Sequence, residues 1–160
     1  MTTKPVAVYW DSCVYIDYIQ REEAHYQELR EIMSEARSGR IIFVASTLVI
    51  AEVVKLRQST EPLQQQAELI RDAFENDYIQ VVSVTRDIAA EAAQLCRDFS
   101  IRPPDAIHLT TALHRQCRCF QTCDAHLLEL DGKIGRPPLK IEFPHRLFQA
   151  QLLLPDDPEA

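Results

Sequence analysis

The feature that most constrains the fold is a regular alternation of short apolar runs with amphipathic helical patterns. The apolar runs favour β-strands, and they lie at residues 5–10, 41–45, 79–84 and 118–123, with a fifth expected at 140–143. The first three are continuously apolar, as strands covered on both faces are. Strands that alternate with helices predict an α/β domain whose parallel sheet carries helices on both faces.

Between these runs, apolar residues recur every three or four positions, which predicts helices. Ser46 or Thr47 can cap one helix and Thr85 another, and Pro103-Pro104 opens a third. The expected helices cover about 22–37, 47–57, 60–77, 86–99, 103–113 and 125–130.

The length of the chain indicates how many domains it forms, and its charge excludes some kinds of nucleic-acid-binding protein. Its 160 residues suit one domain, predicted at 1–150, followed by a tail at 151–160. The net charge of −7 argues against a protein that coats nucleic acid without specificity. Residues 101–150 nevertheless carry 7 basic and 5 acidic groups, so a local basic patch is compatible with an enzyme that visits nucleic acid.

The five cysteines are odd in number, and no secretory signal or membrane-spanning run is evident. We therefore expect reduced thiols in a cytoplasmic protein without a membrane segment. Cys117, Cys119 and Cys123 are spaced C-x-C-x₃-C, which differs from the paired C-x₂-C of common zinc sites. The spacing disfavours zinc and leaves the role of these three residues open.

Four carboxylates stand out by their positions. Asp11 follows the first predicted strand and Asp124 the fourth, and ligands bind at this end of parallel strands. An N-cap is the alternative for Asp11. Glu52 lies in a run of apolar residues, where a buried charge needs a metal or a partner such as an arginine. Asp105 occupies a first helical turn, where a carboxylate also complements the helix dipole.

These four carboxylates can meet at one edge of a parallel sheet. Clustered carboxylates repel one another unless a cation is present, and Mg²⁺ or Mn²⁺ prefers hard oxygen ligands. A site of this kind activates water and holds a phosphodiester for in-line attack. The sequence therefore predicts a metal-dependent phosphodiesterase site.

The same residues carry a family resemblance. Residues 9–16 (YWDSCVYI), 46–52 (STLVIAE), 104–112 (PDAIHLTTA) and 122–124 (TCD) resemble, in order, the motifs of PIN-domain ribonucleases. The similarity is strongest to the VapC-like toxins of bacterial toxin–antitoxin pairs. Two departures are Cys13 and Cys123, which stand where other types of residue are more usual.

The resemblance implies a single PIN-like domain with a parallel sheet in the order 3-2-1-4-5. It implies that Asp11, Glu52, Asp105 and Asp124 bind Mg²⁺ or Mn²⁺ and cleave RNA to leave 5′-phosphates. It also implies an antitoxin partner. The apolar residues Leu147, Phe148 and Leu152–Leu154 are expected to pack on the domain's own helices, with a homodimer or antitoxin surface as the alternative. The implied supporting hydroxyls are Ser12 and Thr122.

Other residues admit two interpretations. Arg102, Lys133 and Arg136 either line a path for RNA phosphates or are ordinary surface charges. His108 could face the acids, although a histidine satisfied locally within its helix is favoured.

The alternatives to a toxin are a stand-alone RNA-processing PIN nuclease and a non-catalytic module that binds RNA or a partner. A phosphoacceptor receiver domain is disfavoured, because Trp10-Asp11 is not the acidic pair that it needs.

Overall fold

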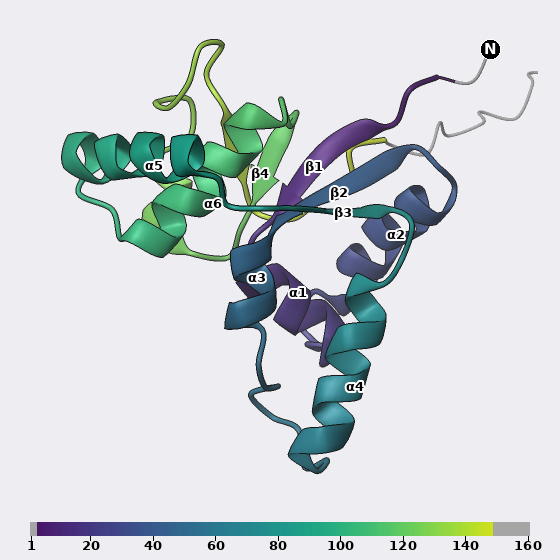
Figure 1. Cartoon of the computed structure of the whole chain (residues 1–160). Helices are drawn as coiled ribbons and strands as arrows, with labels where there is room; N and C mark the ends of the chain where they lie inside the picture. The colour runs from purple at the N-terminus through teal and green to yellow at the C-terminus, as the bar shows by residue number, and fades with distance from the viewer. Residues whose placement is uncertain (1–2, 149–160) are drawn as a thin grey trace, which may run out of the picture.

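The computed structural model describes residues 3–148 as a five-stranded parallel sheet flanked by helices (Figure 1). The strands lie in the order β3-β2-β1-β4-β5, and every pair of neighbours is parallel. This confirms the predicted α/β class and strand order. The strands are β1 (Val6–Trp10), β2 (Ile41–Ser46), β3 (Ile79–Val82), β4 (Cys119–Gln121) and β5 (Lys140–Glu142).

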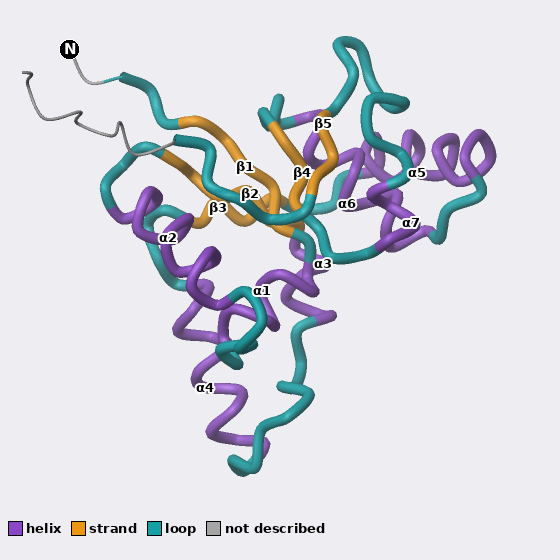
Figure 2. The backbone as a smooth tube through the Cα atoms, turned by 180° about the vertical axis from the view of Figure 1, so that it is seen from behind, coloured by secondary structure: helices purple, strands orange, loops and turns teal. Residues whose placement is uncertain are grey.

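Helices cover both faces of this sheet. They are α1 (Ser12–Ile19), α2 (Tyr26–Arg37), α3 (Thr47–Glu52), α4 (Leu63–Phe74), α5 (Arg86–Phe99), α6 (Pro103–His114) and α7 (Ala125–Leu128). Seen from behind, α1, α2 and α4 gather on one side of the strands and α5, α6 and α7 on the other (Figure 2). No helix within residues 3–148 combines the length and apolarity needed to cross a membrane.

The alternation of side chains along β1 divides the core in two. Val8 and Trp10 pack with residues of α2 and α4 on one face. Tyr9 points to the other face, where it packs with Leu109 of α6 and stacks on Phe120 at 5.0 Å between ring centres. Both faces of β1 are therefore buried, which accounts for its continuous run of apolar and aromatic residues.

Side-chain caps fix where several helices begin. Ser46 and Thr85 each accept a hydrogen bond from a backbone N–H in the first turn of the following helix, as their positions predict. Asp11 and Asp124 cap α1 and α7 in the same way. The two acids that follow strands are thus held by the helices that they start.

Several helix boundaries differ from the prediction. Residues 12–19 form a helix that was not expected, and the helix expected over 22–37 begins only at Tyr26. The helix expected to reach residue 57 ends at Glu52, because Val53 leaves the helical conformation and buries its side chain from an irregular segment. β-Branched valines favour such an exit from a helix.

Other elements are also shorter than predicted, among them the third strand, which ends at Val82. Pro62 delays the helix expected over 60–77, which runs from Leu63 to Phe74. The fourth strand ends at Gln121, so Thr122 and Cys123 belong to the loop that follows it. The predicted tail at 151–160 lies outside the described residues.

Candidate acidic metal centre

The site begins where β1 and β4 end side by side. Trp10 pairs with Gln121 in the sheet, and the backbone N–H of Asp11 donates to the Gln121 carbonyl at 3.0 Å. This pairing places Asp11 beside the loop that carries Thr122 and Asp124. The strand order thus brings together two acids that lie 113 positions apart in the sequence.

A cleft of about 310 Å³ opens at this edge of the sheet. All four predicted acids line it, although they come from four separate segments. Its lining residues are Asp11, Ser12, Cys13, Asp17, Glu52, Arg57, Arg102, Asp105, Cys123 and Asp124.

Asp11 is the most buried of the four acids, with 5% of its surface exposed. One carboxylate oxygen accepts from the Ser12 N–H at 2.8 Å, and the other accepts from Thr122 Oγ1 at 2.9 Å. Asp11 can therefore cap α1 and also take part in the site. Burial raises the pKa of Asp11, although His108, Thr122 and Ser12 oppose this shift, and the negative charge of Asp105 adds to it.

Thr122 connects two of the acids. Its hydroxyl donates to Asp11 and accepts from the Asp124 N–H at 3.0 Å. Asp124 in turn accepts from the His126 N–H at 2.8 Å, which holds its carboxylate at the start of α7. Ser12 has the matching role on the opposite side, because its hydroxyl donates to Glu52 at 3.1 Å.

Glu52 is half-buried, with 31% of its side chain exposed, and its ion-pair partner among the described residues is His108 rather than an arginine. Burial would raise the pKa of Glu52, but the hydrogen bonds from His108 and Ser12 and the nearby Arg102 outweigh burial, so that its pKa lies below its usual value. Glu52 is therefore held as a carboxylate.

His108 is fully buried beneath the acids. Its Nε2 bonds to Glu52 and lies 3.9 Å from Asp11, and its Nδ1 lies 2.6 Å from the Tyr9 hydroxyl. The Tyr9 oxygen also accepts the Ser46 N–H at 3.1 Å, so Tyr9 connects His108 to the start of α3. The favoured expectation of a partner within its own helix is therefore wrong, because both partners of His108 come from distant segments and the ring faces the acids.

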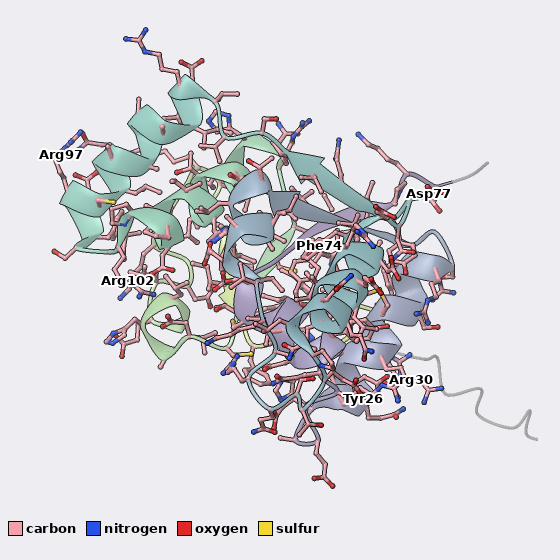
Figure 3. The ribbon with its side chains drawn as sticks, turned by 60° about the horizontal axis from the view of Figure 1, so that its bottom comes forward. Tyr26, Arg30, Phe74, Asp77, Arg97 and Arg102 are labelled. Atoms are coloured by element: carbon pink, nitrogen blue, oxygen red, sulfur yellow. The ribbon has the colours of Figure 1, made fainter. Side chains whose placement is uncertain are left out.

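Asp105 and Arg102 lie at the rim of the cleft. Arg102 Nε donates to Asp105 Oδ2 at 3.1 Å, and its own side chain is 76% exposed. Figure 3 shows Arg102 at the edge of the molecule. Arg102 lines the cleft, whereas Lys133 and Arg136 are not among the described residues that line it.

Asp17 is a fifth carboxylate in the cleft that the sequence prediction omitted. It is buried on α1, and its two oxygens bond to His25 at 3.0 Å and to Arg57 at 3.3 Å. The signal was present, because Cys13 and Asp17 are four residues apart and share one face of a helix. Without a predicted helix after Asp11, this spacing carried no meaning.

The cysteines divide between the core and the cleft. Cys117 and Cys119 are buried in the clusters on opposite faces of the sheet. Cys13 and Cys123 lie in the cleft, where the Cys123 N–H donates to the Cys13 sulfur at 3.4 Å.

The donor set in the cleft fits a hard divalent cation. The four predicted acids and the hydroxyls of Ser12 and Thr122 supply oxygen ligands, which Mg²⁺ and Mn²⁺ prefer.

Comparison with known proteins identifies the family. The model of the PIN domain matches residues 8–133, which is most of the chain, so the protein belongs to the PIN-domain family. The match spans all four acids. No curated protein matches the sequence.

Solved structures of toxin–antitoxin proteins share the fold. VapBC2 from Rickettsia felis, bound to a DNA fragment from its promoter, superimposes with a TM-score of 0.62 at 12% identity, covering 86% of this chain and 98% of that one. VapC20 of Mycobacterium tuberculosis, a toxin that cleaves the sarcin-ricin loop, gives 0.60 at 15% identity, covering 74% and 90%. A toxin–antitoxin complex from Klebsiella pneumoniae gives 0.56 at 18% identity, covering 88% and 99%.

Proposed function

We infer that this protein is a Mg²⁺- or Mn²⁺-dependent endoribonuclease and the toxin of a toxin–antitoxin pair. The observation that carries this proposal is that Asp11, Glu52, Asp105 and Asp124, from four distant segments of the chain, line one cleft. Membership of the PIN family supports the same activity. The fold shared with VapC toxins supports the biological role.

Each cleft residue has a proposed task. The four carboxylates hold the cation, while Ser12 and Thr122 orient Glu52 and Asp11 through their hydroxyls. The cation, when bound, lowers the pKa of water and offsets negative charge on the phosphoryl oxygens. Arg102 is exposed at the rim, where it can bind a neighbouring RNA phosphate.

The proposed partners follow from the structural neighbours. The Rickettsia and Klebsiella structures contain toxins together with antitoxins, so we propose an antitoxin for this chain as well. We further propose a homodimer in the cytoplasm. Exposed apolar residues on and after α3, Ile50 and Val54, supply surface for such contacts.

RNA cleavage with defined variants tests the enzymatic proposal. We expect the purified protein to cut end-labelled RNA in Mg²⁺ or Mn²⁺, to leave 5′-phosphates and to stop when the metal is chelated. Asp124→Asn should slow cleavage about 100-fold or more, because an essential metal ligand is lost. Glu91→Gln is the matched control, since Glu91 is an exposed acid on α5.

Two results would contradict the enzymatic proposal. Equal cleavage by the Asp124→Asn variant would mean that the acids do not act, and absence of cleavage with either metal would favour the non-catalytic module. Expression in bacteria tests the toxin role separately. Growth arrest should require Asp124 and should be relieved by the product of a neighbouring antitoxin gene, whereas unaffected growth would favour a stand-alone nuclease.

A further inference from the structure

A second cluster of metal-ligating side chains lies at one end of the cleft. It combines three kinds of ligand atom: a carboxylate oxygen of Asp17 from α1, an imidazole nitrogen of His25 before α2, and the sulfur of Cys123 after β4. These three atoms lie within 4.8 Å of one another. The proposal developed from this cluster goes beyond the proposed nuclease function and uses none of its four acids.

The spacing of the cluster is close to that of a tetrahedral metal site. Asp17 Oδ2 lies 3.0 Å from His25 Nε2 and 3.5 Å from Cys123 Sγ. Around a zinc ion with bond lengths of about 2.0–2.3 Å, neighbouring ligand atoms are separated by about 3.3–3.8 Å. The Asp17 oxygen is therefore within a few tenths of an ångström of this spacing from each of the other two ligand atoms. The His25 nitrogen and the Cys123 sulfur lie within 4.8 Å of each other, so they would need to approach by at most about 1–1.5 Å to share an ion.

The neighbouring residues leave one oxygen of Asp17 free to bind an ion, and the cluster is open to the cleft. Arg57 bonds to Oδ1 of Asp17, the oxygen that does not face His25, so Oδ2 can bind an ion without losing this pair. Asp17 and Cys123 both line the cleft, which gives an ion and a fourth ligand from solvent a route to the cluster. Asp17 is itself buried, so its charge has little compensation from water.

The chemistry of the cluster differs from that of the four acids. Thiolate and imidazole ligands select zinc-like transition ions, whereas a set of oxygens selects Mg²⁺ or Mn²⁺. We propose that Asp17, His25 and Cys123 form a second metal site that binds a Zn²⁺-class ion, with a water molecule from the cleft as fourth ligand. Binding releases the Cys123 thiol proton to solvent, because the thiolate is the form that coordinates metal.

The ion would connect three segments that are distant in the sequence. It would hold the end of α1, the start of α2 and the loop between Thr122 and Asp124. That loop carries one of the four acids, so occupancy of the second site would stiffen one wall of the nuclease cleft. The site is nevertheless defined by metal binding, which can be measured without RNA.

Cobalt is a suitable probe, because tetrahedral Co²⁺ bound to a thiolate shows a sulfur-to-metal charge-transfer band and intense visible bands. We would titrate the reduced full-length chain with Co²⁺ and then add Zn²⁺. The expected result is one Co²⁺ per chain at this site, a charge-transfer band, and loss of the band as Zn²⁺ displaces Co²⁺.

Substitutions in the protein test whether the charge-transfer band arises from Co²⁺ bound to Asp17, His25 and Cys123. Cys123→Ser should abolish it, and His25→Gln should weaken Co²⁺ binding about tenfold or more. Cys96→Ser is the control, because Cys96 is a partly exposed cysteine on α5, and it should keep the band. Asp11→Asn should also keep it, which separates this site from the four acids. Circular dichroism of the metal-free variants establishes that each is folded.

The proposal is overturned if stoichiometric Co²⁺ produces no thiolate band in the folded wild-type chain. It is equally overturned if the band persists in folded Cys123→Ser. Failure of the protein to cleave RNA would overturn the nuclease proposal and would leave these optical results unchanged.

Discussion

Replacement of His108 by alanine tests whether this buried histidine positions Glu52. The variant removes a hydrogen bond to the Glu52 carboxylate and leaves the Tyr9 hydroxyl without its partner on His108. A hydrogen bond to a charged group contributes about 1.5–3 kcal/mol, and an unsatisfied buried polar group costs about 1–3 kcal/mol. We therefore expect His108→Ala to lower the free energy of unfolding by about 3–5 kcal/mol.

The assay is urea denaturation of the metal-free protein, in parallel with calorimetric titration of Mn²⁺. A loss of this size should lower Tm by about 6–20 °C in a domain of this length. Mn²⁺ affinity should fall about 10- to 100-fold, as it does when a residue that orients a metal ligand is removed. His114→Ala is the control on the same helix, because His114 forms an exposed pair with Glu91 and should cost less than about 1 kcal/mol.

Tyr9→Phe keeps the aromatic ring against Phe120 and removes only the hydroxyl, so it provides a milder variant of the same contact. The double variant should be less destabilised than the sum of the two single variants, with a coupling of about 0.5–3 kcal/mol. The reasoning is refuted if His108→Ala costs no more than His114→Ala and leaves Mn²⁺ affinity unchanged.

Three further predictions concern the acids and their neighbours. Asp11→Asn should raise the stability of the metal-free protein by about 1 kcal/mol, because it removes a buried charge and keeps the cap; lower stability in chelator would contradict this. Thr122→Val should weaken Mn²⁺ binding about tenfold by releasing Asp11, and unchanged binding in calorimetry would show that the hydroxyl does not orient it. The hydrogen bond from His145 to Glu142 raises the pKa of His145, so the stability from this pair is fully present below the usual histidine pKa and is lost as pH rises through the raised value. His145→Gln should remove this contribution, which is less than about 1 kcal/mol for so exposed a pair, and urea denaturation at low and high pH should show a difference only at low pH.

The fold could be predicted because its determinants are local. Continuous apolar runs mark strands buried on both faces, and Asp11 and Asp124 follow such strands directly. Parallel pairing brings the carboxyl ends of the strands to one edge of the sheet. The strand order is therefore sufficient to predict that Asp11 and Asp124 lie near each other.

The remaining parts of the cleft depend on contacts between distant segments. Tyr9 and His108 are 99 positions apart, and periodicity within α6 says which face His108 occupies but not which side chains it meets. Asp17 was missed because no helix was predicted over residues 12–19, and its partners His25 and Arg57 come from other segments. The apolar run around Glu52 predicts one long helix with a buried carboxylate, but the helix ends at Glu52 itself and leaves the side chain half-buried.

Isothermal titration with Mn²⁺ tests the central claim most directly, since the four carboxylates are proposed to share a cation. The wild-type chain and the Glu91→Gln control should bind Mn²⁺ with the same affinity, while Glu52→Gln and Asp124→Asn should each bind about tenfold more weakly or worse. Equal affinity in all four proteins, or no binding by the folded wild-type chain, would contradict the claim.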